Sequence, residues 1–152
     1  MRRKEKEIKE QSEIEAVIRK SAVCRLGLSD GDIPYIVPLC FGYKDNSIYL
    51  HSALKGKKID ILQKNQKVCF EFDADIEVKE AERACDWGMQ FKSVIGFGKA
   101  VFIEDINDKI TALNIIMKQY SDRTFEFTDN AARGVTVIRI DIQSMTGKIS
   151  GF

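Results

Sequence analysis

The sequence predicts a mostly β fold, a barrel-like sheet decorated with a few helices at the ends of its strands. Three observations predict it. Short stretches of alternating apolar and polar residues dominate the chain. Turn-forming residues separate these stretches at short intervals, as in an antiparallel sheet. Apolar residues recur at helical spacing in only a few stretches, so helices are expected to decorate the sheet.

The first helix is predicted to begin near Ser12 and to end near Lys20. Ser12 and Glu15 form the S-x-x-E pattern of a capping box, in which both side chains bond to free backbone N–H groups. Residues 1–11 alternate in charge, so we expect a flexible or helical extension with a solvated face; a nucleic-acid-binding arm is the alternative. The apolar side of the helix would consist of Ile14, Val17 and Ile18.

Three strands are predicted to follow, separated by two polar turns. Asp30, Gly31 and Asp32 mark the first turn. Pro34 and Pro38 interrupt the second strand. Because proline has no N–H group to donate to a neighbouring strand, this strand is expected at an edge of the sheet or with a bulge. The predicted strands are residues 22–29, 33–43 and 48–53, and the second turn is residues 45–47.

The middle of the chain is predicted to continue with a short helix and two strands. The helix covers residues 56–64. Residues 67–73 alternate between apolar and polar side chains, as a half-buried strand does. Residues 91–104 form a longer strand in which two glycines indicate strong bending or a close backbone approach. No structure is assigned to residues 74–90. The helix would bury Ile59, Ile61 and Leu62 and end at Asn65, and the two glycines are Gly96 and Gly98.

The C-terminal third is predicted to hold one helix and a strand. Asn107 is expected to cap the helix, which would run to about Tyr120. A loop follows, and residues 134–143 then form a strand rich in Val and Ile. The tail, residues 145–152, is a candidate for a last extended segment. The core side of the helix would consist of Ile110, Leu113, Met117 and Tyr120.

Length, charge and cysteine usage limit the class of protein. The 152 residues fit one domain, residues 1–152. A net charge of +1 argues against a nucleic-acid module. No apolar stretch is long enough to span a membrane or to serve as a signal peptide, so a cytoplasmic protein is expected. No CxxC pair occurs, which argues against a zinc site. Cys24, Cys40 and Cys69 are expected as buried thiols, whereas the state of Cys85 stays open.

The most informative segment for function is residues 51–60, between a strand and a helix. A helix start offers free N–H groups and the positive end of the helix dipole, and both favour an anion. Gly56 allows a close backbone approach, and Lys57 and Lys58 add positive charge at the same place. Together with Ser52, these features indicate a site for a phosphate group. The alternative is that both lysines are only solvated residues at a helix start.

His51 is the only histidine, and it directly precedes the proposed anion site. A lone histidine in a strand is often a structural residue, but here it is also a candidate for contacting a ring system or a substrate. Trp87 and Phe91 are either pocket residues for a flat ligand or ordinary core aromatics. Gly96 and Gly98 do not form a dinucleotide-binding fingerprint, because the third glycine is missing. The phosphate-binding loop of nucleoside triphosphate enzymes is absent as well.

The order of these pieces resembles the FMN-binding split-barrel family of pyridoxamine 5'-phosphate oxidases, and more closely its branch of nitroimidazole-resistance-type proteins. The matching stretches are YIVPLCFGYKDNSIYLHSALKGKKIDILQKNQKVCFEFD, residues 35–73, and FKSVIGFGKAVFIED, residues 91–105. The resemblance extends over nearly the whole chain from about Glu13 and is strongest in the first stretch. It implies an FMN-binding split barrel that forms a homodimer, with FMN between the two subunits.

The resemblance also implies roles for individual residues. His51 matches a position associated with the active site in the nitroimidazole-resistance branch and is the catalytic candidate. Lys57 and Lys58 match the basic pair that holds the phosphate, where relatives often have an arginine; lysine lacks the bidentate fork of arginine. The strand of residues 37–40 would run beside the isoalloxazine ring. The other cofactor-binding residues implied are Val37, Pro38, Leu39, Cys40, Ser52, Ala53, Gly56, Ser93, Val94 and Lys148.

The implied activity is that of a flavin-dependent oxidoreductase, which would pass electrons from a reduced nicotinamide to a small acceptor such as a nitroaromatic. A non-catalytic flavin-binding protein and a haem-binding split-barrel protein, with His51 as axial ligand, are the alternatives. Pyridoxamine phosphate oxidases carry a C-terminal tryptophan and arginine pattern, whereas this tail reads TGKISGF. Oxidation of pyridoxamine phosphate is therefore not expected.

Overall fold

The computed structural model describes residues 3–152, and one antiparallel sheet dominates it. Its strands follow the order β3-β2-β6-β7-β8-β5-β4, and β1 pairs with β8 outside this path. The strands are β1 (Glu7–Ile8), β2 (Cys24–Asp30), β3 (Ile33–Leu39), β4 (Phe41–Lys44), β5 (Ser47–Ser52), β6 (Lys67–Lys79), β7 (Gly88–Ile103) and β8 (Thr136–Ser150).

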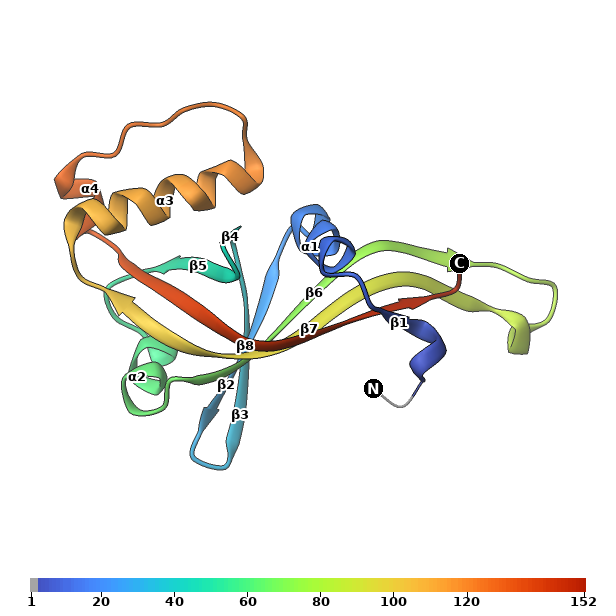
Figure 1. Ribbon diagram of the computed structural model, residues 1–152. Coiled ribbons are helices and arrows are strands. Elements are labelled where there is room, and N and C mark those ends of the chain that lie inside the picture. The colour runs from blue at the N-terminus through green and yellow to red at the C-terminus, as the bar shows by residue number, and fades with distance from the viewer. Residues whose placement is uncertain (1–2) are drawn as a thin grey trace.

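Helices lie at the ends and on the outside of this sheet. Figure 1 shows α3 and α4 above β4 and β5, α2 below the sheet, and the β6–β7 hairpin extending away from the body of the fold. No helix within residues 3–152 is long and apolar enough to cross a membrane. The helices are α1 (Gln11–Lys20), α2 (Lys57–Lys64), α3 (Ile106–Tyr120) and α4 (Asp129–Arg133), with short 3-10 turns at η1 (Lys4–Lys6) and η2 (Ala84–Asp86).

The sheet is closed by the connection between its two edge strands. β3 pairs only with β2, and β4 pairs only with β5, so they form opposite ends of the strand order. Cys40 alone joins them, and two extended residue steps span about 7 Å. The sheet must therefore curl until its edges nearly meet, although no ladder links β3 to β4. This arrangement is a split barrel, and it confirms the predicted fold class.

The core fills the interior of this curled sheet. Val68, Phe70 and Phe72 of β6 point inward, as their alternation predicts, and are at most 4% exposed. The ring of Phe72 lies 4.7 Å, centroid to centroid, from that of Phe41 in β4. Burying one such side chain contributes about 1.5–3 kcal/mol. This contact joins strands that are far apart in the sheet order and so stabilises the closed form.

Two glycines mark close approaches that exclude a side chain. A Cβ atom at Gly96 would collide with the ring of Phe70, which confirms the predicted close approach in this strand. A Cβ atom at Gly42 would lie 2.6 Å from the carbonyl carbon of Ile115. Gly42 therefore lets the backbone of α3 rest directly on β4.

The first helix is confirmed, but its predicted capping box is wrong. α1 begins at Gln11, so Ser12 already lies inside the first turn, and no side chain caps the helix at Glu10. Glu15 instead accepts hydrogen bonds from Arg19 at 2.8 Å and from Tyr43 at 3.2 Å. The carboxylate of Glu15 thus makes a tertiary contact with Tyr43, whereas the local pattern predicts that it bonds to the start of the helix. The buried side consists of Ile14, Val17 and Ile18, as predicted.

The N-terminal extension is not a solvated helix. It contains η1 and then β1, which pairs with the end of β8. Ile8 is only 6% exposed, so the segment takes part in the core. Met1 and Arg2, which belong to the same prediction, lie outside the described residues.

The long C-terminal helix is confirmed, with a different cap and a buried face that matches the prediction only in part. Asp105 caps α3 by accepting a hydrogen bond from the N–H group of Asp108 at 3.0 Å, so the predicted cap at Asn107 is wrong. Tyr120 stays at the rim because its hydroxyl accepts from Phe41 N–H at 3.0 Å and donates to the carbonyl of Ala22 at 2.9 Å. The buried residues are Lys109, Ala112, Leu113 and Ile116, of which only Leu113 was predicted.

Several strand boundaries also differ from the prediction. The strand predicted over residues 33–43 breaks at Cys40, whose side chain is exposed rather than buried. Cys24 is buried as expected, and its burial raises the pKa of its thiol. Cys69 is only half-buried. β6 and β7 extend into residues 74–90, β8 continues through the tail to Ser150, and α4 occupies part of the predicted loop.

We predict that Gly42→Ala lowers the free energy of unfolding by about 1–3 kcal/mol, because the new methyl group meets backbone atoms that cannot move aside. Gly88→Ala is the matched control, since a Cβ atom there has nothing within 4 Å. Urea unfolding measures both variants. Equal stability of the two variants would show that α3 does not rest on β4 in this way.

We predict that Tyr120 makes stability decrease at alkaline pH. Burial raises the pKa of Tyr120 to about 12 from its usual value of 10. The unfolded phenol therefore ionises first, so this contribution is complete below pH ~10 and is lost as the pH rises towards ~12. We measure the free energy of unfolding in urea at several pH values. Over this window it should decrease less steeply for Tyr120→Phe than for the wild type. At neutral pH the variant should be about 1 kcal/mol less stable. If the free energies of unfolding of the variant and the wild type changed with pH in parallel, the raised pKa of Tyr120 would be contradicted.

Candidate functional site

The free edge of β3 and the chain after β5 run side by side. Phe41 pairs with Leu50, so Cys40 and His51 are neighbours at one end. At the other end, the ammonium group of Lys57 lies 4.7 Å from the ring centroid of Tyr35. Five residues of β3 separate these two contacts, a length of about 16 Å. We call this strip, residues 35–40 and 51–58, the edge site.

The start of α2 forms the Tyr35 end of the edge site. The helix cap is Gly56, with a φ of 144°, and no side chain caps the helix there. The N–H groups of Ile59 and Asp60 both donate to the carbonyl of Gly56, at 2.9 and 3.1 Å. The preceding two N–H groups, of Lys57 and Lys58, have no partner within residues 3–152. They are donors at the positive end of the helix dipole, which favours an anion.

The lysine side chains strengthen this preference. Lys57 is exposed, Lys58 is half-buried, and neither forms an ion pair within residues 3–152. Cations at a helix N-terminus oppose the dipole, so a bound anion would offset both. Asp60 is the one acidic residue in the first turn. The aromatic face of Tyr35 holds the Lys57 ammonium group by a cation–π contact.

The other end of the edge site carries the polar pair that closes β5. His51 is exposed and forms no hydrogen bond within residues 3–152, so it is not a satisfied structural histidine. Ser52 is 7% exposed, and its hydroxyl likewise has no hydrogen bond there. Ala53 follows in the exposed loop. These groups are free to contact a bound molecule.

β3 supplies the long side of the edge site. Val37 and Leu39 are half-buried and pack against the core, whereas Pro38 and Cys40 are exposed. Because β3 pairs only with β2, the backbone groups along its outer edge have no strand partner. They can therefore bond to the polar rim of a planar ring.

Three predicted site residues lie elsewhere in the chain. Ser93 pairs with Lys148 across β7 and β8, whereas His51 pairs with Val137. Eleven residues of β8 separate these two places, a path of about 36 Å along the strand. Val94 is fully buried, so its side chain belongs to the core. One chain does not bring these residues to the edge site.

The outer face of the sheet near Ser93 is unusually apolar. Ile36 of β3 and Phe97 of β7 are 64% and 56% exposed, and Ile95 is 47% exposed. Cross-strand register places Cys69 between Ile36 and Phe97. We call Ile36, Cys69, Ile95 and Phe97 the outer apolar face. A groove of about 610 Å³ runs over it, lined by Gly27, Leu28, Ser29, Pro34, Tyr35, Ile36, Lys67, Val68, Cys69 and Phe97.

An ion cluster flanks this face. Arg25 donates to Asp73 at 2.9 Å and to Glu71 at 3.0 Å. These hydrogen bonds raise the pKa of Arg25, and partial burial raises the pKa of Glu71. The two carboxylates hold the Arg25 side chain beside Pro38, the residue that pairs with Arg25.

Sequence reasoning missed Tyr35 and Arg25. Tyr35 opens the stretch that carries the family resemblance, but only tertiary structure shows that its ring meets Lys57. The partners of Arg25 depend on the β2–β6 register, which no local pattern encodes. Among residues 3–152, no three His, Cys, Asp or Glu side chains gather as a metal site would need.

Comparison with known proteins links this geometry to a family. The family described as pyridoxamine 5'-phosphate oxidase matches residues 10–149. An uncharacterized protein of Rhizobium meliloti, RA0666, is 32% identical over 89 residues, which are 59% of this chain and 52% of that protein. The chain thus spans about half the length of the curated relative that it matches.

Solved structures give a closer match over the whole fold. A candidate 5-nitroimidazole antibiotic resistance protein from Bacteroides thetaiotaomicron is 37% identical, with a TM-score of 0.85 over 94% of this chain and 86% of that one. A FAD and haem binding protein from Mycobacterium smegmatis is 14% identical, with a TM-score of 0.86 over 97% of this chain and 75% of that one. At that identity the second likeness shows the fold alone.

Proposed function

This chain belongs to the pyridoxamine 5'-phosphate oxidase family, and on that premise we propose that it is a flavoprotein that binds FMN at the edge site. One observation carries the proposal. The free N–H groups of Lys57 and Lys58 and the ammonium group of Lys57 lie at one end of an unpaired strand edge, and Lys58 follows in the same helical turn. A phosphate suits the charged end, and a planar ring with polar edges suits the strand. FMN combines both features in one molecule.

The chain's own residues would divide the work along the edge site. Lys57, Lys58 and their backbone N–H groups would hold the phosphate, because charge-assisted hydrogen bonds are the strong ones. Tyr35 would fix the position of the Lys57 ammonium group. The backbone of residues 37–40 would orient the ring, and Ser52 would bond to its near end. Bound FMN would supply hydride and electron transfer.

The proposed reaction is electron transfer from a reduced nicotinamide to a small acceptor, with His51 as the residue that meets the substrate. Its imidazole is exposed and forms no hydrogen bond within residues 3–152, so it is free to contact a substrate. A nitroaromatic acceptor is favoured by the 37% identical candidate nitroimidazole resistance protein. Turnover of reduced nicotinamide with a nitroimidazole, followed by absorbance, distinguishes this activity from flavin binding alone.

We further propose that two copies of the chain form the complete site. Ser93 and Lys148 lie about 36 Å along β8 from His51, too far to meet one FMN within a chain. A two-fold dimer would bring these residues of one protomer to the edge site of its partner. The outer apolar face reaches from Ile36 in the edge site to Ile95, two residues from Ser93, and would be buried in such a dimer.

The likeness to a FAD and haem binding protein makes two other ligands worth testing. FAD would add an adenosine monophosphate to the phosphate of the same FMN group. Haem would use His51 as an axial ligand. The absorption spectrum of the purified protein separates haem from flavin, and the mass of the ligand released by denaturation separates FMN from FAD. A protein that takes up none of the three would overturn the proposed function.

We predict that Lys57→Ala with Lys58→Ala raises the Kd for FMN by on the order of 100-fold, because two charge-assisted contacts are lost. Quenching of FMN fluorescence measures the affinity. Lys44→Ala with Lys118→Ala is the matched control, because it removes the same charge from two exposed lysines that lie outside both the edge site and the outer apolar face. Equal affinities of the two double variants would exclude the lysine pair as the phosphate site.

We predict a solution mass of twice the 17.3 kDa of one chain, and joint loss of dimer and flavin in Ile36→Asp. A carboxylate in the centre of a buried apolar face would lack a partner. Light scattering after gel filtration measures the mass, and absorbance measures the bound flavin. Ile36→Val, which keeps the face apolar, should retain both. A monomer that still retains flavin would contradict the two-copy site.

A further inference from the structure

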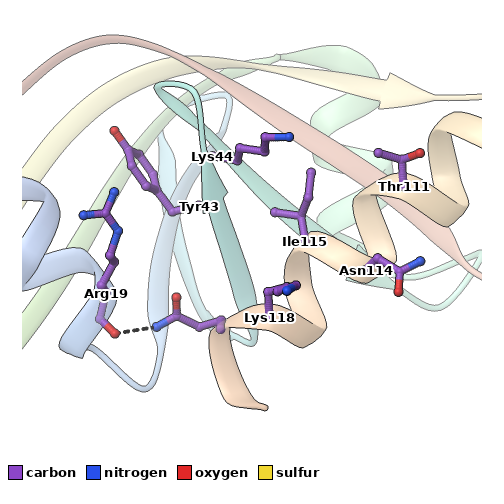
Figure 2. A pocket seen from close by; sticks show the side chains of 8 residues that line it. Arg19, Tyr43, Lys44, Thr111, Asn114, Ile115 and Lys118 are labelled. Atoms are coloured by element: carbon purple, nitrogen blue, oxygen red, sulfur yellow. Dashed lines mark hydrogen bonds between the residues drawn. The ribbon is translucent and has the colours of Figure 1, made fainter. Parts of the chain in front are cut away.

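A second groove lies away from the edge site, between α1, β4 and α3. Its volume is about 600 Å³, which is within the range of small-molecule sites. Figure 2 shows Arg19 and Tyr43 at one end and Thr111 and Asn114 at the other. None of its lining residues belongs to the edge site. They are Arg19, Tyr43, Lys44, Thr111, Asn114, Ile115, Lys118 and Gln119.

The walls of this groove are held in place by tertiary contacts. The amide of Gln119 donates to the carbonyls of Arg19, at 2.9 Å, and Ser21, at 3.0 Å, and so ties the end of α3 to the end of α1; Figure 2 marks the first bond with a dashed line. The approach of Ile115 to Gly42 fixes α3 against β4. The groove is therefore formed before any ligand arrives, and binding would not require the walls to be ordered.

The charge in the groove is unbalanced. Three cations line it, namely Arg19, Lys44 and Lys118. The nearby carboxylate of Glu15 is already engaged by Arg19 at 2.8 Å and by the hydroxyl of Tyr43 at 3.2 Å. Neither Lys44 nor Lys118 forms an ion pair within residues 3–152.

The two unpaired lysines face the same part of the groove. In Figure 2, Lys44 and Lys118 project from opposite walls on either side of Ile115, and both reach toward the end that carries Asn114. Lys118 also lies in the last turn of α3, where a cation is favourable in itself. Lys44 ends the edge strand β4, where a charged side chain also discourages edge-to-edge pairing. Their shared direction creates a positive region above an apolar floor.

We propose that this groove binds a small organic anion, with an apolar body on Ile115 and a phosphate or carboxylate between Lys44 and Lys118. The two lysines supply charge, and the side chain of Ile115, which lies between them, supplies apolar contact area. The site is independent of FMN, because it shares no residue with the edge site. Phosphate and carboxylate anions use the same lysine contacts, so the test compares both.

The test uses ¹⁵N-labelled full-length protein, titrated with phenyl phosphate, benzoate and inorganic phosphate at millimolar concentrations. Saturable shifts of the amide signals of Lys44, Thr111, Asn114 and Ile115 are expected with at least one aromatic anion. Weaker shifts are expected with inorganic phosphate, which lacks an apolar body. Signals of residues 51–58 report the edge site separately, so failure of either site is read independently of the other.

Lys44→Ala with Lys118→Ala should raise the Kd of the bound anion by about tenfold or more. Lys9→Ala with Lys79→Ala is the matched control, because both lysines are exposed and line neither groove. An unchanged amide spectrum away from the substituted residues confirms that each variant folds. Absence of saturable shifts in the wild type would overturn the proposal, as would equal affinities of the two double variants.

Discussion

The one-residue connection at Cys40 is the constraint on which the rest of the structure depends. It holds the end of β3 at Leu39 within about 7 Å of the start of β4 at Phe41, although these strands are the two edges of a long sheet. The edges are not joined by a ladder, so closure depends on chain connectivity and on the aromatic contact between Phe41 and Phe72. The same connection leaves the outer edge of β3 unpaired. An open strand edge usually invites aggregation, and here it is flanked by the chain that returns from β5.

The closure of the sheet also brings together the two segments of the edge site. Because Cys40 leads directly into β4 and β4 pairs with β5, the end of β5 must emerge beside the end of β3. The residues after β5 then run back along β3 toward α2, where Lys57 contacts Tyr35. Gly56 starts α2 with its N–H groups uncapped, and the cation–π contact to Tyr35 anchors that start against β3. Fold closure and a helix start with free N–H groups beside β3 are thus consequences of one topology.

Local patterns predicted the elements whose cause is local. Alternation placed the core side of β6, and the spacing of Ile59, Ile61 and Leu62 placed that of α2. The capping box at Ser12 failed because Tyr43, distant in sequence, contacts Glu15. The predicted face of α3 was right at Leu113, which is buried, and at Ile110, which packs against the core. It was wrong at Tyr120, whose hydroxyl bonds to Phe41 and Ala22 at the rim. The break between β3 and β4 at Cys40 depends on closure of the sheet, which no short stretch of sequence predicts.

The candidate site shows the same contrast between features with a local cause and features that depend on tertiary structure. Residues 51–58 were recognisable because a strand end, a glycine and two lysines are adjacent in sequence. The distance between His51 and Lys148 could not be predicted from the sequence, because it depends on the register of β8 against two different strands. That distance has a thermodynamic consequence for the proposed dimer. A ligand that contacts both protomers binds the dimer and not the separated chains, so its binding energy adds to dimer stability by mass action. On this proposal the flavin is part of the subunit interface, and the affinity for flavin and the affinity between subunits are two measures of one linked equilibrium.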